Sequence, residues 1–104
     1  MPYAKLTQGQ SRTKKYNIDL SSQTGFDGVE IELMKDDSTV LKWRWPDTAG
    51  FEKIVIEGNL YWFNITSIQA QNLEGIYNLR FAVLNSGNSE EKNIIKNFLY
   101  VENE

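Results

Sequence analysis

Apolar and polar residues alternate in short runs along this chain of 104 residues, and the alternation has a period of two. This period places apolar side chains on one face of a β-strand and polar side chains on the other. Groups of Gly, Pro, Asn, Asp and Ser interrupt the runs roughly every 8–12 residues, as turns between strands do. The sequence therefore predicts about seven strands, at residues 16–20, 29–33, 41–45, 51–57, 60–65, 77–83 and 94–101.

Helical periodicity is nearly absent, and only residues 66–73 favour a single helical turn. Short strands with little helix are typical of two antiparallel sheets that pack face to face. The sequence contains no repeat, low-complexity tract or linker that would divide the chain. We therefore expect an all-β protein with one antiparallel β-sandwich domain at residues 13–104. Residues 1–12 are polar and aperiodic, so they are predicted to form a flexible N-terminal arm.

The composition excludes several kinds of chemistry, because the chain contains no cysteine and no histidine. It can form no disulfide, no zinc site built from Cys and His, and no Ser–His or Cys–His catalytic pair. Fourteen acidic and eleven basic residues give a net charge of −3, and the basic residues form no stripe that would suit nucleic acid. We therefore expect a protein that is not an enzyme, needs no cofactor and binds no nucleic acid.

The N-terminal residues lack the apolar run of a signal peptide, and no stretch approaches the length of a transmembrane helix. We therefore expect synthesis in a cytoplasm and no association with a membrane. The acidic residues suggest no metal site, because Asp36 and Asp37 lie in a turn and no calcium-binding loop spacing is present. Glu30 and Glu32 lie two residues apart on one strand, and we assign both to its solvent face.

The large aromatic residues suggest a binding surface. The run at residues 60–65 is apolar on both faces, whereas a strand of a two-layer sandwich needs only one buried face. The surplus favours docking or self-association over core packing alone, since large apolar patches mark interaction surfaces. The candidate interface residues are Trp43, Trp45, Tyr61 and Trp62. Tryptophan and tyrosine also suit sugar rings, so an aromatic platform that binds carbohydrate is the alternative.

Gly75 and Tyr77 form a second pattern, in the sequence LEGIY at the start of a long alternating strand. Immunoglobulin-type sandwiches often have a tyrosine at this position, and its hydroxyl hydrogen-bonds to the backbone a few residues upstream. A half-buried tyrosine in an ordinary strand would give the same pattern. Both interpretations stay open, and the first makes Gly75 and Tyr77 a structural corner.

Several segments follow one another in a characteristic order, namely KYNIDL at 15–20, TG at 24–25, VEIELMKDD at 29–37, ITS at 65–67, LEGIY at 73–77 and FLYV at 98–101. This order resembles the immunoglobulin-like N-terminal domain of phage baseplate upper proteins and related phage tail proteins. Members of that group are commonly the first domain of a longer protein. The resemblance implies an immunoglobulin-like fold. It also implies the role of that first domain, which is to attach the protein to the phage tail.

The same resemblance implies a non-catalytic structural domain in the tail of a phage or prophage. Such a domain docks other phage structural proteins through its apolar faces and the edges of its strands. It also implies a homo-oligomer that is made in the cytoplasm of the bacterial host and is located in the tail of the virion. The carbohydrate-binding module remains the alternative function.

Overall fold

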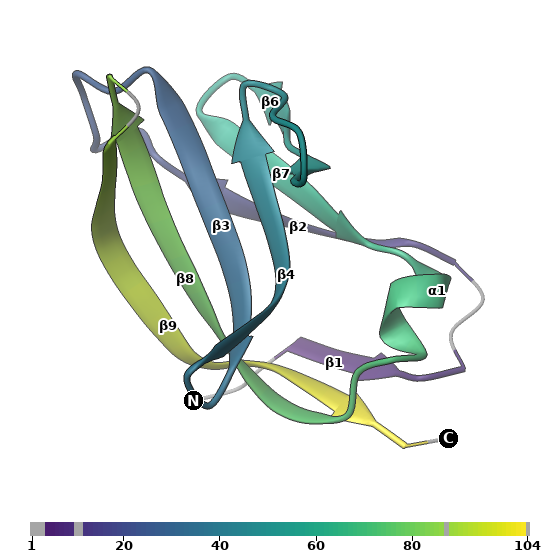
Figure 1. Ribbon diagram of the computed structural model, residues 1–104. Helices are drawn as coiled ribbons and strands as arrows, with labels where there is room; N and C mark the ends of the chain where they lie inside the picture. The colour runs from purple at the N-terminus through teal and green to yellow at the C-terminus, as the bar shows by residue number, and fades with distance from the viewer. Residues whose placement is uncertain (1–3, 10–11, 87, 104) are drawn as a thin grey trace.

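The computed structural model describes residues 4–9, 12–86 and 88–103, which form nine strands and one short helix (Figure 1). The elements are β1 (Ala4–Thr7), β2 (Lys14–Asp19), β3 (Gly28–Lys35), β4 (Ser38–Trp45), β5 (Glu52–Lys53), β6 (Val55–Glu57), β7 (Leu60–Ile65), α1 (Ser67–Ala70), β8 (Gly75–Asn85) and β9 (Asn88–Glu102). Each segment that the alternation assigns to a strand overlaps at least one strand, and the helical turn expected within residues 66–73 is α1. The all-β prediction is confirmed.

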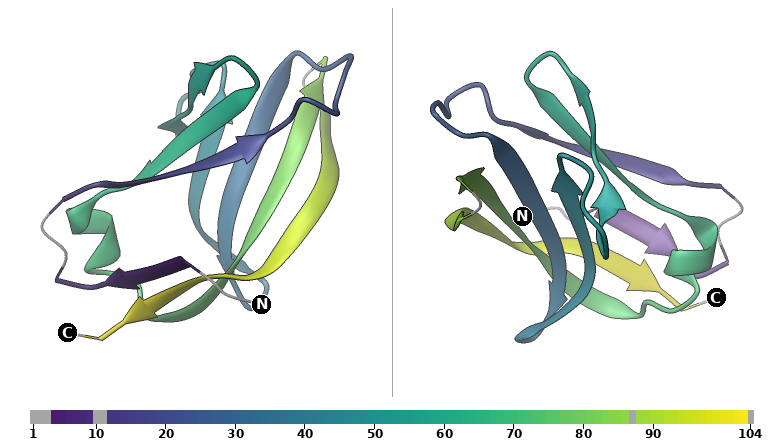
Figure 2. Two further views of the ribbon diagram at one scale, coloured as in Figure 1. Left: turned by 180° about the vertical axis from the view of Figure 1, so that it is seen from behind. Right: turned by 45° about the horizontal axis from the view of Figure 1, so that its top comes forward.

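Two sheets face each other across a shared core (Figures 1 and 2). The large sheet has the strand order β1-β9-β8-β3-β4-β5, and the small sheet has the order β2-β7-β6. Most neighbouring strands are antiparallel, but β1 is parallel to β9 and β4 is parallel to β5. The large sheet curls, so that the end carrying β1 lies beneath α1 in Figure 1. The prediction of about seven antiparallel strands therefore differs from the structure in the number of strands and in these two parallel pairings.

The segment predicted as one strand at residues 51–57 is divided between the two sheets. β5 pairs with β4 in the large sheet, and β6 pairs with β7 in the small sheet. Ile54 lies between them and is 5% exposed. Its burial in the shared core holds the chain at the point where it passes from one sheet to the other. Alternation predicts that a segment is extended, but it does not identify the strand with which the segment pairs.

The N-terminal arm predicted at residues 1–12 contains a strand, and the prediction of a flexible arm is wrong for that part. β1 pairs with the end of β9, and Leu6 is 2% exposed. The Gln8 backbone N–H donates to the Glu102 carbonyl at 3.1 Å, and the Gln8 side-chain amide donates to the Leu73 carbonyl at 2.7 Å. Leu6 belongs to the buried core cluster, so packing as well as pairing with β9 holds this strand. Residues 1–3, 10 and 11 of the predicted arm lie outside the described residues.

β9 contains irregularities that redirect its side chains. Tyr77 pairs with Leu99 and Leu79 pairs with Ile95, so β9 advances four residues (99 − 95) where β8 advances two (79 − 77). Asn97 takes a positive φ of 55° in this bulge, and its backbone N–H donates to the Asn78 Oδ1 atom at 2.9 Å. The bulge turns Phe98 toward the core, although alternation places Phe98 on the same face as Tyr100.

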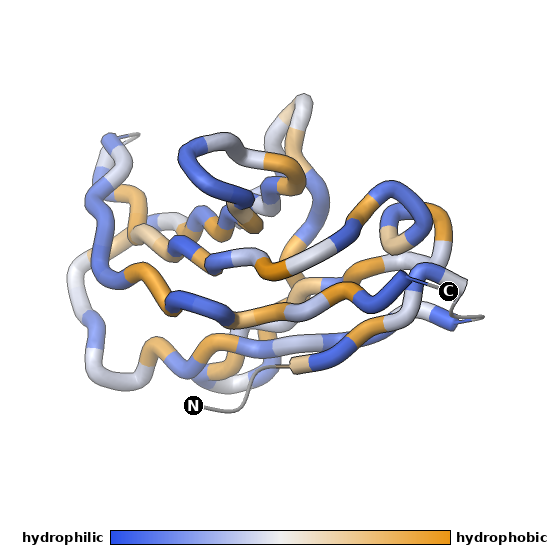
Figure 3. Tube along the Cα trace, turned by 90° about the horizontal axis from the view of Figure 1, so that it is seen from below, coloured by the Kyte–Doolittle hydropathy of each residue, from blue (hydrophilic) through white to orange (hydrophobic). Residues whose placement is uncertain are grey.

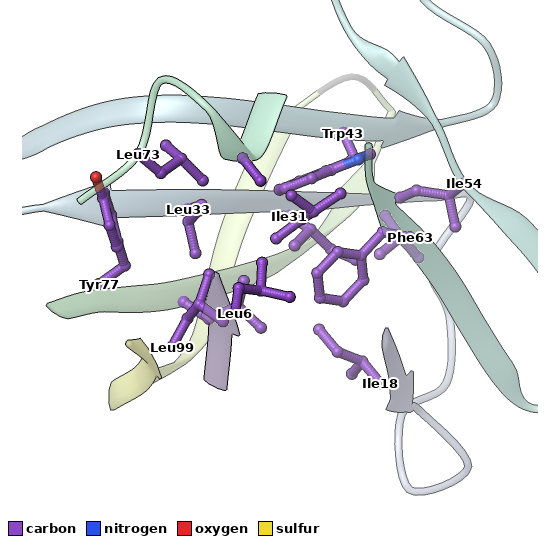
Figure 4. Close-up of a cluster of buried hydrophobic side chains, with 14 of the residues drawn as sticks. Leu6, Ile18, Ile31, Leu33, Trp43, Ile54, Phe63, Leu73, Tyr77 and Leu99 are labelled. Atoms are coloured by element: carbon purple, nitrogen blue, oxygen red, sulfur yellow. The ribbon is translucent and has the colours of Figure 1, made fainter. Parts of the chain in front are cut away.

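The core lies between the sheets (Figure 4), and Ala70 of α1 belongs to it. Figure 3 shows hydrophobic and hydrophilic residues following one another along individual strands, which is the alternation that supplies the core from each sheet. Thr66 caps α1, because its hydroxyl accepts from the Gln69 N–H at 3.1 Å while the Gln69 side chain accepts from the Thr66 N–H at 2.9 Å. This cap sets the direction of α1 and places Ala70 in the core.

Candidate interaction surface

Trp43 lies in the centre of the core and is 1% exposed. Its ring centroid is 4.9 Å from that of Phe63 on the opposite sheet, and its indole N–H donates to the Asn64 carbonyl at 3.2 Å. The tryptophan therefore joins the two sheets through both a ring contact and a hydrogen bond. The prediction that Trp43 is an interface anchor is wrong, because its side chain is enclosed by the fold.

Trp45 and Tyr61 lie against each other beside the core. Their ring centroids are 6.3 Å apart in an edge-to-face arrangement, and Phe26 lies 6.2 Å from Tyr61. Both side chains are partly buried and pack against the core cluster. Most of their apolar surface is thus used within the molecule, and together with the buried Trp43 they form no open aromatic platform.

Trp62 lies on the outer face of the small sheet, away from the core. The buried side chains of β7 are Phe63 and Ile65, so the alternation directs Trp62 outward. Its cross-strand neighbours are Val55 on β6 and Asn17 on β2. Val55 is 53% exposed. We call Val55, Leu60 and Trp62 the outer patch, because these three apolar residues share the outer face of the small sheet.

Two features of Trp62 distinguish it from an ordinary surface residue. The Lys15 Nζ atom lies 4.9 Å from the centroid of the Trp62 ring, within the range of a cation–π contact. The indole nitrogen is buried, and within the described residues it has no hydrogen-bond partner. A buried N–H without an acceptor is costly. Val55 is exposed, whereas Leu60 and Trp62 are partly buried, so the outer patch combines partly exposed apolar surface with an unsatisfied donor.

The strand at one edge of the small sheet is β2, and its side chains alternate between the core and solvent. Tyr16 packs 5.8 Å from Phe63 and 5.5 Å from Phe98, and burial raises the pKa of Tyr16 to about 12. Lys15, Asn17 and Asp19 are exposed. The Ser21 backbone N–H donates to Asp19 Oδ1 at 2.9 Å, and this hydrogen bond lowers the pKa of Asp19. Asp19 is therefore charged at neutral pH.

The outer face of the large sheet has the opposite character, because it carries a network of ion pairs. Glu30 lies in its centre and is 7% exposed. Arg44 donates to Glu30 through Nε at 3.1 Å and also through Nη2. Arg80 donates through Nη1 to Glu30 at 3.3 Å and to Glu32 at 2.6 Å, and through Nε to Glu91 at 2.7 Å.

The charges of this network set the protonation of its members. Burial alone would raise the pKa of Glu30, but the hydrogen bonds and positive charges of Arg44 and Arg80 outweigh it and hold that pKa below its ordinary value. Burial alone would likewise lower the pKa of Arg80, but Glu91, Glu32 and Glu30 raise it. Both groups remain charged at neutral pH, and each carboxylate is engaged by a guanidinium group.

The sequence predicts that Glu30 and Glu32 lie on the solvent face, and both do lie on the outer face, but alternation does not predict that Glu30 is buried. The arginines opposite these glutamates indicate an ion-pair network. Glu30 pairs directly with Arg44 across β3 and β4, and Glu32 pairs directly with Arg80 across β3 and β8. These cross-strand pairs become visible only when the register is known. Val55 and Leu60 share a face with Trp62, but this too can be recognised only from the register of β6 and β7, so the sequence alone does not identify them as interface candidates.

Gly75 and Tyr77 form the start of β8. The Tyr77 hydroxyl accepts a hydrogen bond from the Glu74 backbone N–H at 2.8 Å, which is the upstream backbone contact that a tyrosine corner makes. Tyr77 is 3% exposed, and Gly75 takes a positive φ of 95°. The Lys35 ammonium group donates to the Glu74 carbonyl at 2.7 Å. These contacts hold the connection between α1 and β8, so this pair of residues is structural.

A hollow of about 600 Å³ lies beside α1. Its lining comes from β4, β5, β7 and the α1 turn, and consists of Trp43, Phe51, Glu52, Lys53, Asn64, Thr66, Ile68 and Gln69. The Gln69 amide donates to the Glu52 carboxylate at 3.1 Å, and Gln69 also completes the cap of α1. The polar groups of Gln69 therefore already serve the fold.

In the described segments, no three His, Cys, Asp or Glu side chains are grouped so that they could hold a metal ion. No helix within residues 4–9, 12–86 and 88–103 has the length and apolar composition needed to cross a membrane. Comparisons with known proteins find no matching family model, no matching curated protein and no matching solved structure.

Proposed function

We propose that this chain is an immunoglobulin-like sandwich that serves as a non-catalytic docking domain in the tail of a phage or prophage. The strand order supports the fold. Immunoglobulin sandwiches place strands B, E and D side by side in one sheet and strands G, F, C and C′ in the other. Here β2, β7 and β6 occupy the first set of positions, and β9, β8, β3 and β4 occupy the second.

The corner at Tyr77 also supports the immunoglobulin-like assignment. In these sandwiches the corner tyrosine lies near the start of strand F, two residues before a disulfide-bonded cysteine in antibody domains. Here the residue two positions after Tyr77 is Leu79, which is fully buried. The chain contains no cysteine, so an apolar side chain fills the position of the disulfide.

The single observation that carries the docking role is the outer patch. A sheet in a two-layer sandwich needs only one apolar face, and the second face of the small sheet carries Trp62 beside the exposed Val55. Tryptophan is enriched among residues that dominate the energy of protein interfaces. We expect the partners to be other structural proteins of the phage particle. The assignment to a tail rests on the resemblance of the sequence, and it implies synthesis in the bacterial cytoplasm and a final location in the virion.

The first test of the proposal is to identify the genes on either side of the gene that encodes this chain. We expect some of them to encode tail proteins, and we expect the chain to be present at a fixed stoichiometry in purified particles. The chain is then co-expressed with the adjacent tail proteins, and co-elution is measured by size-exclusion chromatography. Absence from particles together with no co-elution would overturn the proposal.

The matched variants separate the outer patch from general surface hydrophobicity. Trp62→Ser should reduce co-elution with the tail partner by about tenfold or more, because a buried interface tryptophan contributes about 2 kcal/mol or more. Ile68→Ser is the control, since Ile68 is 73% exposed but lies on α1 outside the outer patch. Equal loss in both variants would count against docking through the patch. Quenching of tryptophan fluorescence by polysaccharides, without a protein partner, would support the carbohydrate-binding alternative instead.

A further inference from the structure

The second edge of β2 is open to pairing. β2 pairs with β7 on one side, and no other described strand pairs with it. The Leu20 backbone N–H donates to the Asn59 carbonyl at 3.2 Å, in register with the β2–β7 ladder. Because the direction of backbone hydrogen bonding alternates along a strand, the even-numbered residues of β2 bond toward β7. Lys15, Asn17 and Asp19 therefore direct their backbone N–H and C=O groups toward the open side.

Two copies of β2 can pair through this edge in one register that satisfies their charges. A twofold axis perpendicular to the sheet requires that residues on the same face lie opposite each other. With Asn17 opposite Asn17 of the second copy, Lys15 lies opposite Asp19 and Tyr16 lies opposite Ile18. The symmetry generates each of the last two pairs twice. Opposite charges meet on the outer face and apolar side chains meet on the core face, and both kinds of cross-strand pair are favourable.

The other open edges are less suited to pairing. The first part of β9 has no described strand on its outer side, but its register shifts twice and Asn97 takes a positive φ of 55°. Bulges twist an edge away from a neighbouring chain. β1 contains four residues, β5 two and β6 three, so each offers a shorter ladder than β2. The part of β4 that β5 does not cover shifts its register with β3 between Thr39 and Leu41. β2 offers six regular residues without a bulge.

We propose that this chain self-associates by antiparallel pairing of β2 with β2 of a second copy, centred on Asn17. The pairing joins the two small sheets into one sheet of six strands. Since Asn17 is the cross-strand neighbour of Trp62, the two outer patches then lie on the same face of that sheet. This inference rests on the proposed docking function, because the dimer would present two outer patches on one surface to a partner protein. The joined edges bury less than about 1,200 Å², so the dimer is transient and forms at high protein concentration.

The first test uses single cysteines, because the chain has none of its own. In the proposed register the two Asn17 Cα atoms lie about 5.5 Å apart, which a disulfide can bridge. The two Lys15 Cα atoms are separated by four residues along the strand, about 13 Å, which a disulfide cannot span. Under mild oxidation Asn17→Cys should therefore form a covalent dimer, and Lys15→Cys should remain monomeric on non-reducing gels. Equal cross-linking of the two variants, or none, would overturn the proposal.

The second test measures the dissociation constant by sedimentation equilibrium. Asp19→Lys places like charges opposite each other twice, so the dissociation constant should rise about tenfold. The double variant K15D/D19K restores opposite charges and should restore dimerisation. Failure of the double variant to recover, while circular dichroism shows it folded, would exclude this register. Asn17→Pro removes an outward N–H and leaves the β2–β7 ladder intact, so it should also abolish the dimer.

These outcomes are independent of the test of docking. The cysteine and charge variants are measured on the isolated chain without any tail protein. A chain that remains monomeric but loses its tail partner on Trp62→Ser would refute the β2 pairing and keep the docking function. A chain that dimerises through β2 but binds no tail protein would refute the docking function and keep the β2 pairing.

Discussion

Glu30 lies in the middle of the outer face of the large sheet, enclosed by the side chains of Arg44 and Arg80. A buried charge is tolerated only when it is paired, and removal of one partner leaves the other uncompensated. The network therefore fixes three neighbouring strands, β4, β3 and β8, in one register. Its contribution to stability depends on Glu30 being ionised.

The pKa of Glu30 leads to a prediction for acid pH. This pKa is lower in the folded chain than the ordinary value of 4.5. Glu30 therefore stabilises the fold fully above about pH 4.5, and the stabilisation is lost as the pH falls through the lower folded-state pKa. The difference in free energy of unfolding between the native chain and Glu30→Gln, measured by urea denaturation, should be largest at pH 7 and should shrink below pH 4.5. A difference that does not change with pH would contradict this assignment.

The Tyr77 hydroxyl leads to a second prediction. Tyr77→Phe removes the acceptor of the Glu74 N–H and should lower the free energy of unfolding by about 1–2 kcal/mol. Tyr61→Phe is the matched control, since no hydrogen bond of its hydroxyl is seen among the described residues, and it should change stability little. Thermal unfolding followed by circular dichroism measures both variants. Equal effects would show that the corner hydrogen bond contributes nothing particular.

β1 is the element with the largest departure from the sequence-based expectation. Its core-facing side chains are only Ala4 and Leu6, and an alternation of two apolar residues is too short to be recognised as a strand. The strand is instead specified by a parallel pairing with β9 at the far end of the chain. Non-local pairing of this kind is set by tertiary packing, as is the division of residues 51–57 between β5 and β6.

The burial of Leu6 leads to a prediction at this scale. Leu6→Ala should cost about 2–5 kcal/mol of stability, because it removes a fully buried side chain and leaves a cavity. Ile68→Ala removes a side chain that is 73% exposed, so its cost should be close to zero. Urea titration at neutral pH compares the two. A small effect of Leu6→Ala would mean that β1 contributes little to the fold in solution.

At the scale of the whole molecule, the strands themselves were largely predictable because alternation follows directly from having one buried face. The candidate interaction surface is harder to predict from the sequence. Trp43, Trp45, Tyr61 and Trp62 have similar sequence surroundings, yet Trp43 is enclosed by the core and Trp62 lies on the outer face. Strand pairing decides which face of each strand is covered, and a single sequence contains little information on pairing.

The shared core predicts that the two sheets unfold together. Trp43 contacts Phe63 between the sheets, so its fluorescence reports on their separation. In a variant with Trp45→Phe and Trp62→Phe, the urea midpoint of Trp43 fluorescence should coincide with that of far-ultraviolet circular dichroism. Two separate midpoints would show that one sheet survives without the other.

The pairing of β1 with β9 also has a consequence for synthesis on the ribosome. Ala4 lies opposite Leu99, 95 residues later in the chain (99 − 4). At roughly 5–20 residues per second, about 5–20 s pass between the translation of these two partners. Throughout that time Leu6 has no strand to cover it, so this edge of the molecule closes only after Leu99–Glu102 has left the exit tunnel.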